Sequence, residues 1–322
     1  MKTVLLRPSG KDYIWGGTRL KREFGKSGLP QDPLAETWEC STHPDGPSWV
    51  ASGPESGLTL GEWLAAHPDY LGSSPSVSGG IPVLVKLIDA RENLSVQVHP
   101  DDAYAAREEN GQAGKTEMWY VVDAEPGAKL VFGLNRETSR EELRASIGRG
   151  TLEQYLNYVP VRRDDIFFIP SGTIHAIGRG VLIAEIQQNS NLTYRLYDYG
   201  RLGKDGRPRQ LHVEKALAVA DLSGSQDVRQ QLRLLRYRPG FAQESLSRCR
   251  YFAVDRCLLN ADGIAMPPLP ESFRVLLCLD GAGQVQEAGE RLSFQKGDTL
   301  FIPATTPELT LSGRAEFLLV RC

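Results

Sequence analysis

The chain has 322 residues, of which 41% are hydrophobic and 24% are charged, so it is long enough for two hydrophobic cores of ordinary composition. Its formal net charge of −3 gives no field that would attract nucleic acid or anionic lipid, and neither partner is expected. Only a short apolar run precedes Arg7, too short for a signal segment or a membrane span, which favours a cytoplasmic protein.

Most of the elements expected along the chain are strands. Gly, Pro, Asp and Asn separate these short apolar runs, as in "DAEPGA" and "PSG", and such punctuation is typical of strands joined by turns. The runs cover residues 83–88, 94–98, 118–122, 129–133, 165–170 and 181–188. This rhythm favours a β-sandwich or jelly roll.

Helices are fewer, and capping boxes mark where they begin, with Ser or Thr followed three residues later by Glu or Gln. The three boxes are Thr59/Glu62, Ser139/Glu142 and Thr151/Gln154. The last two fall between strands and predict an inserted helical hairpin at about 136–158. A fourth helix is expected over 212–222.

An internal repeat indicates two related modules. The stretch "DIFFIPSGTIH" at 165–175 aligns without a gap to "DTLFIPATTPE" at 298–308, and "EMWYVVD" at 117–123 aligns to "RVLLCLD" at 274–280. We therefore expect a mainly β protein with two jelly-roll barrels, the first spanning 1–235 with the helical insertion and the second spanning 236–322. In the second copy Arg replaces Glu117 and Glu replaces His175, so that module is expected to be structural or dimerising.

The strand at 94–98 carries polar side chains on one face. Because successive strand residues point to opposite faces, Ser95, Gln97 and His99 share a side, with Leu94, Val96 and Val98 on the other. Pro100 lacks a backbone donor and is expected to end the strand. A polar face of this kind, in an otherwise apolar region, suggests a binding site.

Two residues of this polar face, Gln97 and His99, form a candidate metal site with Glu117 and His175. The five cysteines include no C-x-x-C pair, so a metal would need nitrogen and oxygen ligands. Such a set is offered by Gln97, His99, Glu117 and His175. It suits Zn²⁺ and leaves a position for water or substrate, although two histidines and one carboxylate are also the ligands of Fe(II) oxygenases.

Six ordered motifs resemble the type I mannose-6-phosphate isomerases, zinc enzymes of the cupin superfamily, in their short bacterial form. They are "YIWGG" at 13–17, "ETWECSTHPDG" at 36–46, "LSVQVHPDD" at 94–102, "GKTEMWYV" at 114–121, "FIPSGTIHAIGRG" at 168–180 and "EIQQNSNLTYRLYDYGR" at 185–201. The resemblance covers about residues 1–220 and treats the remainder as a degenerate second cupin. It implies cupin-type folds for both barrels.

The resemblance also implies roles for individual residues. The zinc ligands of the family fall on Gln97, His99, Glu117 and His175. Its active-site residues fall on Arg195, Lys115 and Glu185, with Ser95 in the matching "LS-x-Q-x-HPD" strand. Two departures stand out: Gly114 and Thr116 replace the His and Pro of longer members, and Arg201 replaces a family lysine.

The predicted reaction is the interconversion of mannose 6-phosphate and fructose 6-phosphate through an enediolate. Zn²⁺ and Arg195 would stabilise the oxyanion, and either Lys115 or Glu185 would move the proton, a choice that the sequence leaves open. The residues expected to bind the phosphorylated hexose are Ser95, Arg201, Lys86 and Trp15, with Trp38 as a second aromatic wall.

Two other functions fit the same residues. A non-catalytic sugar-phosphate-binding cupin would use the pocket without chemistry, and another metal-dependent cupin enzyme, such as an Fe(II) oxygenase, would use the same ligand types. The sequence leaves the oligomeric state open.

Overall fold

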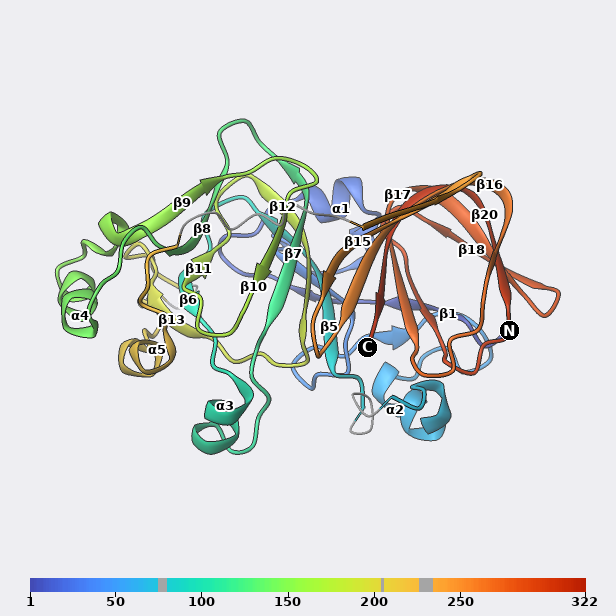
Figure 1. Cartoon of the computed structure of the whole chain (residues 1–322), viewed down its shortest axis with the longest axis horizontal. Coiled ribbons are helices and arrows are strands. Elements are labelled where there is room, and N and C mark those ends of the chain that lie inside the picture. The colour runs from blue at the N-terminus through green and yellow to red at the C-terminus, as the bar shows by residue number, and fades with distance from the viewer. Residues whose placement is uncertain (75–79, 204–205, 226–233) are drawn as a thin grey trace.

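The computed structural model describes residues 1–74, 80–203, 206–225 and 234–322, which form a mainly β structure of three sheets with helices at the periphery (Figure 1). All of the strand pairs in these sheets are antiparallel. Among the described residues, no helix is long and apolar enough to cross a membrane.

Two of the sheets make up the first half of the molecule. The five-stranded sheet has the order β13 (Tyr194–Tyr197), β6 (Val96–Val98), β11 (His175–Ala176), β8 (Lys129–Leu134) and β9 (Leu156–Pro160). The six-stranded sheet has the order β10 (Ile166–Ile169), β7 (Glu117–Ala124), β12 (Val181–Gln188), β5 (Val83–Ala90), β3 (Glu36–Cys40) and β2 (Ser9–Lys11).

The third sheet has nine strands. Its order is β14 (Leu234–Arg238), β15 (Phe241–Arg248), β16 (Ala253–Met266), β20 (Leu309–Arg321), β17 (Arg274–Glu287), β19 (Thr299–Ile302), β1 (Val4–Arg7) and β4 (Trp49–Val50), while β18 (Glu290–Gln295) pairs with β17. The first strand of the chain therefore pairs with β19, nearly 300 residues later, and ties the two halves together.

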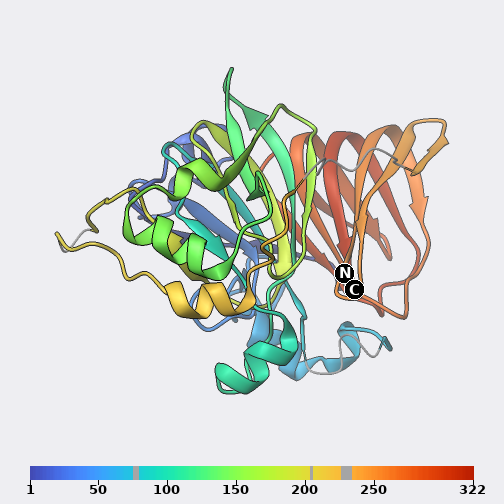
Figure 2. The same ribbon diagram turned by 60° about the vertical axis from the view of Figure 1, so that its left-hand side comes forward.

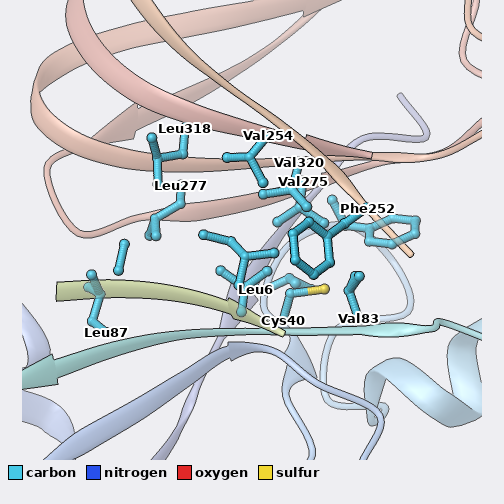
Figure 3. Close-up of a cluster of buried hydrophobic side chains, with 14 of the residues drawn as sticks. Leu6, Cys40, Val83, Leu87, Phe252, Val254, Val275, Leu277, Leu318 and Val320 are labelled. Carbon is cyan, nitrogen blue, oxygen red and sulfur yellow. The ribbon is translucent and has the colours of Figure 1, made fainter. Parts of the chain in front are cut away.

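The six-stranded sheet is buried on both faces, which explains why its strands read as continuous apolar runs. On one face Val83 and Leu87 meet Val275, Leu277 and other residues of the nine-stranded sheet, as Figure 3 shows. On the other face Ile88, Trp119 and Ile183 form a core with side chains of the five-stranded sheet. The first half is thus a two-sheet sandwich whose six-stranded sheet packs on the second half.

Helices cover the outer face of the five-stranded sheet. Leu143 of α4 (Arg140–Gly148) and Leu217 of α5 (Val213–Val219) pack on Val96 and Val98 of β6, and both helices lie on this side of the molecule (Figure 2). The remaining α-helices are α1 (Arg19–Glu23), α2 (Leu60–Ala66) and α3 (Asp102–Glu108).

The internal repeat is confirmed by strand register. Glu117 pairs with Ile169 across β7 and β10, and the aligned residues Arg274 and Ile302 pair in the same way across β17 and β19. The capping boxes at Thr59 and Ser139 also begin helices α2 and α4, and both side chains accept a hydrogen bond from the residue three positions on.

The predicted helical hairpin is wrong in its second half. After Thr151 the chain makes only a 3₁₀ turn, Leu152–Tyr155, and then enters strand β9. Thr151 makes no side-chain cap, and the backbone that follows hydrogen-bonds to β8 instead of continuing a helix. Leu94 is a second correction: it precedes β6 and packs in the sandwich core, not with Val96 and Val98 on the outer face.

Candidate active site

The polar side chains gather between the two sheets of the sandwich, toward one end. Lys86 of β5, Glu117 of β7 and Glu185 of β12 alternate with the apolar residues that face the nine-stranded sheet, so they point into the sandwich interior. Gln97 of β6 and His175 of β11 pair directly across the opposing five-stranded sheet. Charged groups are thus concentrated inside an otherwise apolar core.

Three buried side chains converge at the centre of this region. His99, Glu117 and His175 bring one potential ligand atom each to within 4.8 Å of one another. His99 Nε2 lies 3.5 Å from Glu117 Oε2, and His175 Nε2 lies 3.4 Å from Glu117 Oε1. The Glu117 Oε1 atom is buried and has no hydrogen-bond partner among the described residues.

The two imidazoles are oriented for metal binding. His99 Nδ1 donates to the carbonyl of Leu192 at 2.7 Å, and His175 Nδ1 donates to the carbonyl of Thr173 at 2.8 Å. Each ring therefore points its Nε2 lone pair toward Glu117. Metal-binding histidines are commonly held in this way, with the other ring nitrogen donating to a backbone carbonyl. The residues fit a divalent ion.

Gln97 stands beside this group as a fourth potential ligand. Its amide nitrogen lies 3.4 Å from His175 Nε2. Ligation would require the amide oxygen at that position, which a rotation of the amide by half a turn supplies.

Lys115 closes one side of the group. Its Nζ lies 2.8 Å from Glu117 Oε2 and 3.1 Å from His99 Nε2. The turn that carries it packs tightly on the start of α3, where a Cβ on Gly114 would lie 2.5 Å from the Asp101 carbonyl carbon. The close approach of Gly114 to this backbone leaves no room for a side chain and lets Lys115 reach the ligands.

Glu185 and Lys86 form a second buried charge group next to Lys115. Lys86 Nζ lies 3.2 Å from Glu185 Oε1 and 3.6 Å from Glu36 Oε2. Trp119 donates its indole N–H to Glu185 Oε2 at 2.9 Å. Trp38 likewise donates its indole N–H to Glu36 Oε2 at 2.8 Å, so each carboxylate is held by Lys86 and by an indole.

Burial and charge set the protonation states of these groups. Burial, together with Lys115, lowers the pKa of His175 to about 4 and holds the pKa of His99 well below 6.5, so both rings are neutral at pH 7. Burial and the nearby Glu185 raise the pKa of Glu117. Burial also opposes ionisation of Glu185, but Lys115 and Lys86 outweigh it and lower the pKa of that carboxyl.

A pocket opens from this group toward solvent. Its volume is about 290 Å³, at the lower end of the range for small-molecule sites, roughly 300–1,000 Å³. The predicted residues that line it are Trp15, Lys86, Ser95, Gln97, Lys115, Glu185 and Arg195. Because Gln97 and Lys115 contact the His–Glu–His group, that group lies at the inner end of the pocket.

The outer part of the pocket carries two arginines. Arg195 donates from Nε to Ser95 Oγ at 3.1 Å and from Nη1 to the carbonyl of Gln210 at 2.9 Å. Arg209 is held by Asp198, with Nε 2.7 Å from Oδ2. Burial and the adjacent Arg209 lower the pKa of Arg195, a sign that this region is short of negative charge.

Two predicted residues lie elsewhere. Arg201 does not line the pocket; it donates to Asp198 Oδ1 at 2.5 Å and stacks on Tyr199. Trp38 is fully buried behind Lys86, whose Nζ lies 4.9 Å from its ring centroid. Neither contacts the space where a ligand would bind.

Eight residues of the pocket lining were not predicted to bind a ligand. They are the aliphatic residues Ile88, Leu94 and Ile177, together with Tyr13, Glu36, Asn191, Thr193 and Arg209. Tyr13 stacks on Trp15, with ring centroids 5.4 Å apart, and both belong to the "YIWGG" motif. Arg209 lies in a loop rich in arginine and glycine, and no sequence pattern distinguishes it from its neighbours.

Known proteins match the chain along nearly its whole length. Residues 4–125 match the model for "Phosphomannose isomerase type I, catalytic domain", and residues 243–322 match "Mannose-6-phosphate isomerase, cupin domain". The mannose-6-phosphate isomerase ManA of Bacillus subtilis is 37% identical over 317 residues, covering 97% of this chain and 96% of that protein. The mannose-6-phosphate isomerase of Streptococcus mutans is 37% identical over 305 residues, or 95% and 93%.

A solved structure matches equally well. The crystal structure of the mannose 6-phosphate isomerase from Bacillus subtilis superposes with a TM-score of 0.92 at 36% identity, covering 99% of each chain. Sequence and structure therefore agree, and the chain belongs to the type I mannose-6-phosphate isomerase family.

Proposed function

We propose that the chain is a zinc-dependent aldose–ketose isomerase that interconverts mannose 6-phosphate and fructose 6-phosphate through an enediolate. The observation that carries this proposal is the buried His99–Glu117–His175 group at the inner end of a pocket lined by four cationic side chains. The similarity to relatives named mannose-6-phosphate isomerase supports the choice of substrate.

His99, Glu117 and His175 would hold the metal, with Gln97 as a fourth ligand. Three observations support this: the unpartnered Glu117 Oε1, the two neutral imidazoles, and Nδ1 atoms anchored on backbone carbonyls. Nitrogen and oxygen ligands with an open position suit Zn²⁺, and the reaction requires no redox change. When bound, the ion would supply Lewis acidity at the sugar oxygens next to the reacting carbons.

Lys115 and Glu185 would share the proton transfer between C1 and C2. Both line the pocket, and Lys115 Nζ lies 3.9 Å from Glu185 Oε1, so the Glu185 carboxylate would stabilise a proton held on Lys115. Lys86 and Trp119 hold Glu185 ionised and fixed in place, which keeps it unprotonated and oriented but weakens it as a base.

To decide between the two, the wild type, Glu185→Gln and Lys115→Gln are compared for exchange of the sugar C2 proton with solvent deuterium. The variant that lacks the base loses both exchange and turnover. A variant that keeps exchange and loses only turnover identifies the other residue as the base.

Arg195 would stabilise the developing oxyanion, and Arg209 would bind the phosphate. Both line the pocket, Arg195 pairs in register with the potential ligand Gln97, and the planar fork of Arg209 matches a phosphate dianion. Ser95 orients Arg195 and Asp198 orients Arg209. In this assignment Arg201 acts indirectly, by sharing Asp198.

We propose a jelly-roll core for each half of the chain, with the boundary between residues 235 and 236. The described residues form three open sheets, and closed barrels are not part of this proposal. The cytoplasmic location stays a prediction from the sequence.

An isomerase assay on zinc-loaded and chelated protein tests the function. Zinc-loaded protein should convert mannose 6-phosphate to fructose 6-phosphate, and chelated protein should not. A protein that binds the sugar phosphate without converting it would be a non-catalytic cupin, and one that consumes oxygen with Fe(II) would be an oxygenase; either result rejects the proposal.

A further inference from the structure

The second half of the molecule buries an arginine where the first half places its ligand carboxylate. Arg274 and Glu117 occupy the same register in the repeated strand pairs, and both lie on the inner face of their sheet. Arg274 is 4% exposed. One half of the fold thus presents a carboxylate at this position, and the other half presents a guanidinium.

The Arg274 guanidinium is incompletely satisfied. Nη1 donates to the carbonyl of Pro267 at 2.9 Å, but Nε and Nη2 have no hydrogen-bond partner among the described residues. Burial, together with Arg321, lowers the pKa of Arg274. A buried charge without partners is costly, so a structure that retains one commonly uses it to bind an opposite charge.

Arg274 lines a pocket of about 470 Å³ that is separate from the one in the first half. Three further arginines line it, Arg236, Arg238 and Arg321, and its lining contains no acidic side chain among the described residues. Of these, Arg321 is neutralised by Asp255. The pocket therefore keeps an excess of positive charge around Arg274.

Apart from Tyr237 and Gln243, the remaining walls of this pocket are apolar. Phe241, Met266 and Leu319 extend the core of the second half to the pocket, and prolines form part of its rim. A fully hydrated ion would leave these walls uncovered, whereas an anionic group attached to an apolar body would cover them and also pair with the guanidiniums.

We propose that this pocket binds a small organic anion, a phosphate monoester or a carboxylate carried on an apolar body, with Arg274 as its central ligand. Nε and Nη2 of Arg274 engage the anion, and Arg236 contributes from the exposed rim. The inference stands on the second half alone and does not depend on isomerase activity.

The test uses phenyl phosphate and benzoate as probes, benzyl alcohol as the neutral probe, and isothermal titration of the zinc-loaded protein. The expected result is a binding event for at least one anion that weakens about ten- to a hundredfold in Arg274→Met, as for a lost charged hydrogen bond. The anion that binds more tightly identifies the headgroup that the pocket prefers. Arg314→Met, which removes an exposed arginine of β20 outside the pocket, serves as the charge-matched control and binds normally.

Two further measurements keep the proposal falsifiable. Without ligand, Arg274→Met should melt no lower than the wild type, because a similar apolar side chain replaces a buried unpaired charge. Arg236→Ala changes an exposed residue, retains the fold, and should weaken anion binding several-fold. Equal anion binding by Arg274→Met and the wild type would overturn the inference, because an anion held only in the first pocket depends on neither Arg274 nor Arg236. The absence of anion binding by the wild type at millimolar concentration would also overturn it.

Discussion

Removing Lys86 should destabilise the protein far more than removing a comparable surface lysine. Lys86 is 4% exposed and is shared by Glu185 and Glu36. In Lys86→Met, Glu185 keeps Lys115 at 3.9 Å and the indole of Trp119. Glu36 keeps only a hydrogen bond from Trp38, so it becomes a buried carboxylate without a counter-charge.

The size of the effect follows from breaking a buried ion pair. Lys86 and Glu36 are only 4% and 6% exposed, so solvent does little to replace the lost partner. Removing one partner of a buried ion pair costs roughly 3–5 kcal/mol, and we expect the free energy of unfolding to fall by about that amount at pH 7.

Urea denaturation of the zinc-loaded proteins at pH 7 measures the difference between the variant and the wild type.

Lys11→Met is the matched control. Lys11 Nζ lies 4.5 Å from the same Trp38 ring, but this residue is partly exposed and forms no ion pair among the described residues. Its removal should cost less than about 1 kcal/mol at pH 7. Equal losses of stability for the two variants would refute the reasoning.

Three other substitutions separate the roles assigned above. Arg195→Ala should lower kcat about 10²- to 10³-fold while zinc content stays at the wild-type level, because Arg195 does not contact the metal group; near-normal kcat would remove it from the reaction. Arg209→Ala should raise the KM for mannose 6-phosphate at least tenfold, and an unchanged KM would exclude Arg209 as a phosphate ligand. Asp102 accepts hydrogen bonds from Gln188 and from Tyr251 of the second half, and these contacts outweigh burial and lower its pKa. The wild type should therefore exceed Asp102→Asn in stability by about 1 kcal/mol above pH 5, a partly screened contribution that is lost as the pH falls below about 4; a gap that widens in acid would contradict this.

The alternation of one strand was enough to predict much of the site. Ser95, Gln97 and His99 were placed on one face from the period of two, and the structure puts the first two in the pocket lining and the third in the His–Glu–His group. The sequence alignment of Glu117 with Arg274 also predicted their equivalent positions in the two strand pairs. Such positions can be aligned because a strand and its partner keep their spacing when a module is duplicated.

Other features have no local signature. The pairing of β1 with β19 joins segments nearly 300 residues apart, and no short-range pattern encodes such a contact. Arg209 enters the pocket because Asp198 holds it there, which depends on where two loops meet in space. The 3₁₀ turn after Thr151 gives way to strand β9 because pairing with β8 outweighs a weak helix signal.

Zinc stoichiometry measured together with turnover tests the central claim most directly. Protein dialysed against chelator and then against Zn²⁺ should bind one ion per chain and recover conversion of mannose 6-phosphate, whereas His175→Ala should bind none under the same conditions and remain inactive. Full turnover by metal-free protein, or wild-type zinc binding by His175→Ala, would contradict the assignment of His99, Glu117 and His175 as the metal centre.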